Sequence, residues 1–173
     1  NGTTPQVIGA GTFSGNTIRS LIIGNPSGVS ILGTLNVTGI VKAESGNLSS
    51  GGFLTLESSV SGTALIDGSG AGNVTGVVTM QRYLSSGFGY KYISSPFRNA
   101  LVSALGDEIN LADPFPLIYS YDESRTSSGW VSWATPAYQL SPVKGFAVNF
   151  GSSVAPVVID ISGEVNNGSL TAV

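Results

Sequence analysis

The sequence predicts an all-β protein in which N-terminal, β-helix-like (solenoid) coils pack on a C-terminal antiparallel β-sandwich. Its 24 glycines and 8 prolines interrupt the chain so often that only residues 97–112 could hold three helical turns. Short runs of Val, Ile, Leu and Thr fill the intervals between these breakers, as is typical of strands. Thirteen of the fifteen aromatic residues follow residue 80, which indicates two regions, 1–79 and 80–173.

Region 1–79 is expected to form short strands joined by glycine-centred turns. In several segments, such as 33–39 and 52–56, Gly is followed by alternating apolar and Thr or Asn residues. This alternation suits solenoid coils with an apolar interior, and the scarcity of aromatic residues, only Phe13 and Phe53, suits narrow coils. An antiparallel sandwich with tight hairpins would show the same alternation and stays open as the alternative. The expected strands are Ile18–Ile23, Val29–Leu32, Leu35–Val41, Phe53–Leu56, Thr63–Ile66 and Val74–Thr79.

Region 80–173 carries enough strand-like segments for a small sandwich. Residues 82–84 and 90–97 predict two strands around Ser85-Ser86-Gly87, and Leu117–Asp122 with Trp130–Ala134 predict a hairpin. Asn166-Asn167-Gly168 is a strong turn signal between the last two strands. The remaining expected strands are Gly145–Phe150, Val157–Ser162 and Leu170–Val173.

The chain lacks the residues that most enzymes use for proton transfer and nucleophilic attack. It contains no histidine and no cysteine, and only seven basic and ten acidic residues. General-base, thiol and transition-metal chemistry therefore lose their usual side chains, and disulfide bonds are excluded. We expect a protein that is not an enzyme and that binds no cofactor.

Charge and hydropathy also limit the partners. The net charge is −3 and the basic residues are scattered along the chain, which disfavours nucleic acid and anionic membranes. No apolar run approaches the ~20 residues of a membrane span, so no membrane insertion is expected. Residues 1–30 lack the pattern of a secretory leader, and we expect the chain to be a mature or excised piece.

Residues 73–84, followed by 89–97, carry a distinctive order of motifs. They resemble a recurrent junction in very large secreted and cell-surface proteins of Bacteroidetes, where Gly/Thr/Val-rich β-helical coils run into a strand like Gln81-Arg82-Tyr83 and then an aromatic strand like Tyr92-Ile93-Ser94-Ser95-Pro96. The resemblance implies export by the type IX route, a location at the bacterial cell surface or outside it, and a role in adhesins or surface filaments.

Two groups of residues with side-chain oxygen atoms are candidates for chemistry. The pairs Asp107-Glu108 and Asp122-Glu123 could suggest a glycosidase, but neighbours on a strand point to opposite faces, and a solvated turn is the favoured interpretation. Asp67 and Asn73 bracket a Gly-rich loop whose oxygen atoms could ligate a structural calcium ion. The loop lacks the dense Asp spacing of known calcium motifs, so a plain turn is favoured there as well.

The aromatic residues of the second region offer a candidate ligand site. Trp130, Trp133 and Tyr138, with Tyr119 and Tyr121 across the expected hairpin, could stack on sugar rings. Trp130 and Trp133 are three positions apart, so on a regular strand they face opposite sides, and at least one is expected in the core.

The sequence as a whole predicts a non-enzymatic extracellular structural or adhesive module of a bacterial surface protein or filament. Its partners would be copies of itself or neighbouring modules of the same surface protein, with glycans as a further class. A filament subunit joined by strand addition at its termini is one alternative. A carbohydrate-binding module using the region of Trp130, Trp133 and Tyr138 is another. The residues expected to mediate assembly are Val7, Ile8, Phe13, Leu170 and Val173.

Overall fold

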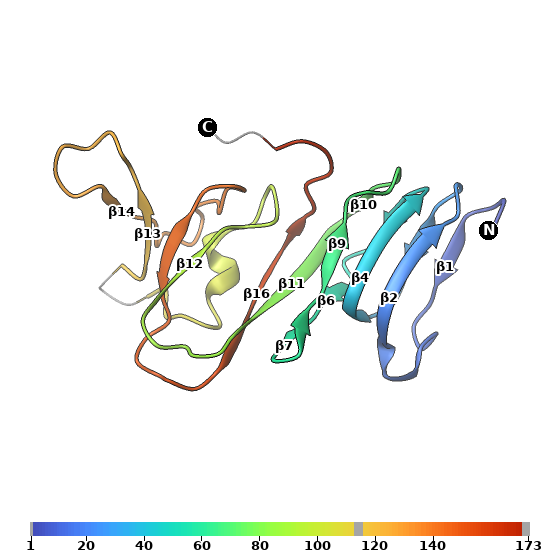
Figure 1. The fold of residues 1–173 in the computed structure, drawn as a ribbon, viewed down its shortest axis with the longest axis horizontal. Helices are drawn as coiled ribbons and strands as arrows, with labels where there is room; N and C mark the ends of the chain where they lie inside the picture. Colours follow the sequence, from blue (N-terminus) through green and yellow to red (C-terminus); the bar gives the residue numbers. More distant parts are fainter. Residues whose placement is uncertain (1, 113–115, 171–173) are drawn as a thin grey trace.

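The computed structural model describes residues 2–112 and 116–170, and these residues form an all-β fold without an α-helix. About four stacked coils form a solenoid at one end of the molecule, and an antiparallel sheet stands at the other end (Figure 1). The predicted fold class is confirmed, since the solenoid is present and the antiparallel sheet is compatible with a sandwich. Two short 3-10 helices, η1 (Ser14–Asn16) and η2 (Val102–Leu105), complete the described structure.

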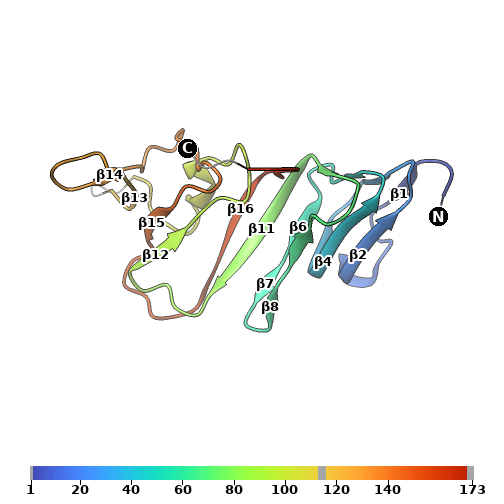
Figure 2. The ribbon, with the colours of Figure 1, turned by 45° about the horizontal axis from the view of Figure 1, so that its top comes forward.

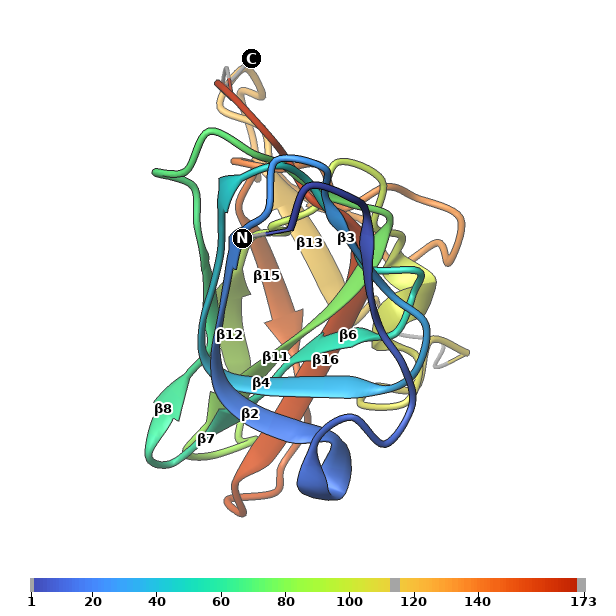
Figure 3. The same cartoon turned by 90° about the vertical axis from the view of Figure 1, so that its right-hand side faces the viewer.

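Two parallel sheets form the sides of the solenoid. Seen along its length in Figure 3, successive coils lie one behind another, with β2 and β4 along the same side. The first solenoid sheet has the order β1 (Gln6–Ile8), β3 (Val29–Ile31), β5 (Leu48–Ser49) and β10 (Val74–Thr75). The second has the order β2 (Thr17–Gly24), β4 (Leu35–Ser45), β6 (Leu54–Leu56) and β11 (Val77–Leu84), with β9 (Leu65–Asp67) beside β4. A small hairpin consists of β7 (Ser58–Ser59) and β8 (Gly62–Thr63).

Aliphatic side chains of matching position stack through the solenoid interior. In the first sheet Leu48 pairs with both Val29 and Val74, and all three are buried. In the second sheet Leu54 pairs with Leu35 and Val78, each at most 1% exposed. The alternation seen in the sequence therefore places every second residue in a ladder that runs from coil to coil, which is where the solenoid gains its hydrophobic stabilisation.

The coils touch backbone to backbone at one corner, where the dipeptides Gly24-Asn25, Gly46-Asn47 and Gly72-Asn73 precede the first sheet. A Cβ atom added to Gly72 would lie 1.9 Å from the carbonyl oxygen of Gly46, and one added to Gly46 would lie 1.9 Å from that of Asn25. Only glycine allows this approach, so the Gly-Asn repeat sets the spacing of the coils.

Strand β11 is the last strand of the solenoid and also connects it to the C-terminal region. Strand β11 pairs with β6 in parallel on one edge and with β16 (Val157–Glu164) in antiparallel orientation on the other. The two long strands run side by side across the middle of the molecule (Figure 2). The region boundary expected between residues 79 and 80 falls within β11, and one hydrophobic cluster extends across it, from Ile23 in the solenoid to Phe146 beyond β11.

Beyond β16 lies the end sheet, whose strands follow the order β12 (Tyr90–Ile93), β15 (Phe146–Asn149), β13 (Ile118–Tyr121) and β14 (Trp130–Ser132). Its inner face carries Ile118, Phe146 and Val148, all buried in the same cluster as Val102 and Leu105 of η2. The end sheet is therefore held to the solenoid by a continuous apolar core, with one of its faces left outward.

Two details differ from the predicted strands. Residues 82–84 and 90–93 belong to β11 and β12, but these strands do not pair with each other, because β11 takes β16 as its partner and β12 takes β15. The strand expected at Leu170–Val173 is not observed at Leu170, which lies outside any strand, while residues 171–173 lie outside the described residues. The predicted hairpin of 117–122 with 130–134 is confirmed as β13 and β14.

The Gly-Asn corner gives a sharp test of coil spacing. Gly72→Ala forces the backbones of two coils apart, and we expect it to lower the free energy of unfolding by about 2 kcal/mol or more. Gly68→Ala in the same loop is the matched control, because nothing lies within 4 Å of its Cβ position, and it should change stability by less than about 0.5 kcal/mol. Urea unfolding followed by circular dichroism measures both, and equal effects would contradict this account.

Candidate functional site

The outer face of the end sheet gathers five aromatic side chains. Residues directly opposite each other on paired strands share a face, and the register places Tyr90 and Tyr92 on β12 level with Asn149 and Ala147 on β15. Ala147 in turn pairs with Tyr119 on β13, and Tyr121 pairs with Trp130 on β14. We call Tyr90, Tyr92, Tyr119, Tyr121 and Trp130 the aromatic face.

The aromatic face consists of four exposed residues and the half-buried Tyr119, and its rings are arranged around a hollow. Trp130 lies 6.5 Å from Tyr92 between ring centroids, with the two planes 23° apart, and Tyr121 packs against Trp130 edge-on at 5.1 Å. Tyr90 and Tyr119 lie 6.3 Å apart. Ala147 has a small side chain at the centre of the sheet, so a hollow of about 440 Å³ remains, lined by four of the rings and Ala147.

No charged side chain projects from this face. The eight positions of its four strands that point outward are described residues without exception, and they carry five aromatic residues, an alanine and two neutral polar residues, Ser132 and Asn149. Lys91 points away from the face, and its Nζ donates a hydrogen bond to the carbonyl of Phe88 at 2.9 Å. The hollow is therefore suited to a neutral ligand.

The structure separates the residues that the sequence grouped as one site. Trp130, Tyr119 and Tyr121 lie on the aromatic face, but Trp133 lies elsewhere, 6.0 Å from the ring of buried Phe146 and 4.8 Å from that of Tyr138. Its Nε1 donates to the carbonyl of Gln139 at 3.1 Å. The expectation that Trp130 and Trp133 face opposite sides agrees with this arrangement, and the single platform of Trp130, Trp133 and Tyr138 is not formed.

Sequence reasoning missed Tyr90 and Tyr92, which are 51% and 78% exposed. The sequence does indicate that they lie together, because two tyrosines separated by one residue on a strand must share a face. That pattern did not identify the partner strands, since the strand order that places β12 next to β15, and β15 next to β13, joins segments far apart in the chain.

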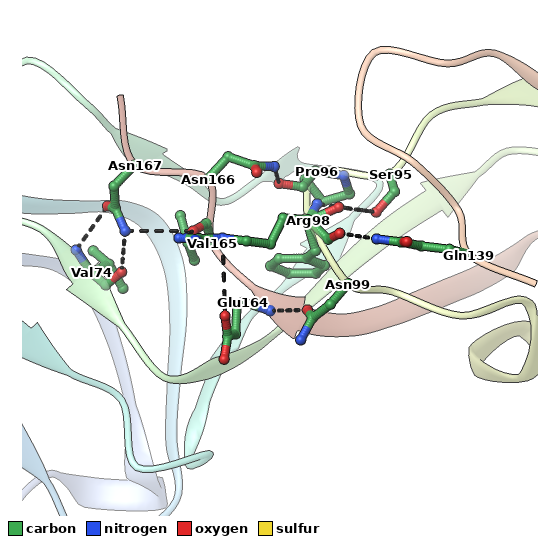
Figure 4. A network of polar contacts seen from close by, with 11 residues as sticks. Val74, Ser95, Pro96, Arg98, Asn99, Gln139, Glu164, Val165, Asn166 and Asn167 are labelled. Carbon is green, nitrogen blue, oxygen red and sulfur yellow. Dashed lines mark hydrogen bonds and ion pairs between the residues drawn. The ribbon is translucent and has the colours of Figure 1, made fainter. Parts of the chain in front are cut away.

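A network of polar contacts joins the solenoid to the end of β16 (Figure 4). The Oδ1 of Asn167 accepts a hydrogen bond from the backbone N of Val74 at 3.2 Å, and its Nδ2 donates to the carbonyl of Val74 at 2.9 Å. Asn166 Nδ2 donates to the carbonyl of Pro96 at 2.8 Å, and Asn99 Oδ1 accepts from the backbone N of Glu164 at 2.8 Å. These contacts fasten the segment after β16 to both parts of the molecule.

Asn167 takes the place of a further coil. Within the first solenoid sheet, the backbone N of Val29 donates to the carbonyl of Asn47, and that of Leu48 donates to the carbonyl of Asn73. The next donor in this series, the N of Val74, meets the side-chain oxygen of Asn167 instead. The strand β16 closes the second sheet and the Asn167 amide closes the first, so this end of the solenoid has no open edge at Val74.

The other end of the solenoid is open. Among the described strands, β1 pairs only with β3, and β2 pairs only with β4. Val7 is 60% exposed and Ile22 61% exposed beside a hollow of about 340 Å³ lined by both strands. Of the other residues expected to mediate assembly, Ile8 and Phe13 pack partly buried against the core, Leu170 is exposed, and Val173 lies outside the described residues.

The two candidate calcium ligands make hydrogen bonds within the protein: Asp67 in a local turn and Asn73 between two coils. Asp67 Oδ1 accepts a hydrogen bond from the backbone N of Ser69 at 2.8 Å, and hydrogen bonds from Ser69 lower the pKa of Asp67. The backbone N of Asn73 donates to Asn47 Oδ1 at 2.9 Å as part of the Gly-Asn corner. Nothing in these contacts tests calcium binding, which stays a prediction for Asp67 and Asn73.

The acidic pairs are likewise placed by the structure. Hydrogen bonds from the Ser124 side chain and backbone lower the pKa of Asp122, which lies at the start of the β13–β14 turn. Asp107 and Glu108 meet Asp160 of β16, with one carboxylate oxygen from each within 4.8 Å of the others. Three carboxylates at this distance repel one another when all are ionised, and a proton on one of them or a bound cation would relieve that repulsion.

Glu108 is the member of this trio that holds the proton. Its Oε1 accepts from the backbone N of Asp160 at 2.9 Å, and its Oε2 is buried without a partner among the described residues. Burial, followed by the side-chain hydrogen bond and the charge of Asp107 and the charge of Asp160, raises the pKa of Glu108 to about 8. The trio does not line the hollow of the aromatic face.

No protein-family model, curated protein or solved structure matches the chain. No helix within the described ranges is long and apolar enough to cross a membrane. The features of the structure that bear on function are the aromatic face, the closed junction at β11 and the open end of the solenoid.

The raised pKa of Glu108 predicts a pH-dependent stability. The folded protein keeps the Glu108 proton up to about pH 8, whereas the unfolded chain releases it near the usual glutamate pKa of 4.5, so stability should fall as pH rises between these values. Glu108→Gln should remove this fall and leave the variant more stable than the parent above pH 8, by about 1–2 kcal/mol after solvent screening.

Urea unfolding from pH 5 to pH 9 in EDTA measures this effect. Glu123→Gln is the matched control, since Glu123 is exposed in the loop between β13 and β14 and should leave the pH profile of the parent unchanged. A parent stability that is flat across this range would contradict the assignment of the proton to Glu108.

Proposed function

We propose that this chain is a non-catalytic structural and adhesive module, in which the solenoid is a stiff shaft that holds the aromatic face at its end. The observation that carries the proposal is the double pairing of β11, with β6 of the solenoid on one edge and β16 on the other. A single hydrophobic cluster crosses this strand, so force or contact at the end sheet is transmitted through strand pairing rather than through a flexible linker.

A location outside a bacterial cell belongs to the same proposal. It is supported by the low content of charged residues, which leaves the surface to Thr, Ser, Asn and backbone groups, and by the absence of cysteine, which frees the fold from any dependence on redox conditions. The resemblance of residues 73–97 to junctions in Bacteroidetes surface proteins supports export by the type IX route.

Binding rather than catalysis is the activity that the aromatic face favours. Its outward positions supply no carboxylate, amine or imidazole that could move a proton, and they present aromatic rings and neutral polar groups. Exposed rings of this kind make large contacts at low entropic cost, which suits weak contacts repeated along a surface.

The open end of the solenoid favours a second candidate function, self-association by strand addition. The unpaired edges of β1 and β2 offer backbone hydrogen-bonding groups to another strand, whereas β16 and Asn167 occupy the opposite end. Because β16 and Asn167 cover the opposite end of the solenoid within the described residues, pairing between two copies through the edges of β1 and β2 gives a closed dimer rather than a filament.

The stiff-shaft proposal predicts that both parts unfold together. Leu48 is fully buried in the solenoid, so Leu48→Ala should lower the free energy of unfolding by about 2–5 kcal/mol. Both tryptophans lie in the end region, and their fluorescence should report the same shift in urea midpoint as the circular dichroism of the whole chain. Leu65→Ala, at a side chain that is 48% exposed, is the matched control and should have a small effect. A tryptophan transition that ignores Leu48→Ala would overturn the proposal.

The assembly candidate predicts a dimer that depends on β2. Ile22→Lys places a charge at the open edge and should weaken any concentration-dependent dimer, because edge lysines oppose strand addition. Val60→Lys, at a residue 80% exposed in the β7–β8 turn, should leave association unchanged. Analytical ultracentrifugation with electron microscopy measures both, and long fibres or an equal response of the two variants would contradict this mode of assembly.

A further inference from the structure

The aromatic face has the chemistry of a site for a neutral polysaccharide. We propose that it binds a chain of uncharged, flat pyranose rings, such as a β-1,4-linked glucan, xylan or chitin, which lies on the rings of Tyr92, Tyr119 and Trp130. This inference rests on the proposed adhesive function and adds the ligand class and the site residues, among them Tyr90 and Tyr92.

The shape of the face selects a ligand with flat apolar surfaces. Pyranose rings whose hydroxyl groups are equatorial present their axial C–H groups on both faces, and such surfaces pack well on aromatic rings. The ring centroids of Trp130 and Tyr92 are 6.5 Å apart although two strands lie between β14 and β12, and the two ring planes differ by only 23°. A chain crossing the sheet over Ala147 would therefore meet several rings in succession.

The electrostatics select a neutral ligand. An acidic glycan, a nucleic acid or an anionic lipid surface would need basic side chains, and the eight outward positions of the end sheet supply none. Two lysines lie in or near the strands of the end sheet, and their amino groups have other contacts. Lys91 Nζ donates to the carbonyl of Phe88, and Lys144 Nζ lies 4.2 Å from the ring centroid of Trp133, which is outside the aromatic face. Ser132, Asn149 and the tyrosine hydroxyls provide hydrogen-bonding groups of the kind that sugar hydroxyls use.

The rings are held in place before any ligand arrives. The strands that carry them are backed by the buried side chains of Ile118, Phe146 and Val148. The ring of Tyr121 lies over Gly129, where an added Cβ would come within 2.7 Å of it, so the absence of a side chain at Gly129 makes room for the ring. A prearranged face loses little entropy on binding, which favours a usable affinity from a shallow site.

The test uses the full chain with defined polysaccharides. Microcrystalline cellulose, chitin and insoluble xylan serve in pull-down assays, and tryptophan fluorescence titration with cellohexaose and xylohexaose gives affinities in solution. Trp130→Ala and Tyr92→Ala remove rings that are 42% and 78% exposed, so both variants should keep the fold, as checked by circular dichroism. Tyr138→Ala is the matched control, because Tyr138 is similarly exposed at 43% but packs on Trp133.

We expect at least one neutral polysaccharide to bind, with affinity reduced about tenfold or more by Trp130→Ala and by Tyr92→Ala and unchanged within about twofold by Tyr138→Ala. The fluorescence change on binding should disappear with Trp130→Ala and persist with Tyr138→Ala.

Several results would overturn the inference. These are binding to none of the neutral polysaccharides, binding that the two face variants leave intact, and a loss with Tyr138→Ala equal to that with Trp130→Ala. Binding only to polygalacturonate or to phosphatidylcholine vesicles would also overturn it, as would a dimer that Trp130→Ala disrupts in the absence of glycan binding. None of these results bears on the coupled unfolding of solenoid and end sheet, so the failure of this inference can be told from the failure of the stiff-shaft proposal.

Discussion

The structure depends on β11 being paired along both edges. A solenoid whose last coil exposed its edge would present an unpaired row of backbone groups beside an apolar interior, a combination that recruits other strands. Strand β16 satisfies the edge of the second sheet over the full length of β11, and the Asn167 amide satisfies Val74 in the first. The end sheet is attached through the same strands, so one set of contacts both closes the solenoid and holds the sheet that carries the aromatic face.

The solenoid could be predicted because its determinants are local. Gly-Asn corners and alternating apolar residues recur in each coil, and parallel stacking follows when each coil buries its interior against the next. The closure could not be predicted, because it depends on distant contacts such as the hydrogen bond between Thr79 and Ser162, 83 positions apart. The turn signal at Asn166-Asn167-Gly168 predicts a connection between two strands, whereas in the structure the Asn167 side-chain amide makes the two hydrogen bonds to Val74 that a neighbouring backbone would make.

The candidate site, like the fold, could be predicted only where it depends on local sequence pattern. Alternation on a strand was enough to separate Trp130 from Trp133, and the pairing of β13 with β14 brings Tyr121 to Trp130 as the hairpin pattern suggested. Tyr138 is excluded because it lies outside any strand and packs on Trp133. The inclusion of Tyr90 and Tyr92 depends on the strand order of the end sheet. Propensity and periodicity carry no information on that order, since it is set by which buried faces fit together around Phe146 and Val148.

The two surfaces proposed to make contacts, the open edges of the solenoid and the aromatic face, lie at opposite ends of the molecule. The open edges of β1 and β2 lie at the solenoid end, and the end sheet lies at the opposite end (Figure 1). Two copies joined through their open edges would carry their aromatic faces far apart, so one dimer could contact a repetitive polymer at two places. Because the second contact is then intramolecular, weak individual sites gain avidity, provided that the shaft is stiff enough to hold the faces at a fixed separation. In the adhesive function that we propose, the stiff solenoid and its closure at β11 would hold the faces apart, and the shallow aromatic faces would supply the weak contacts.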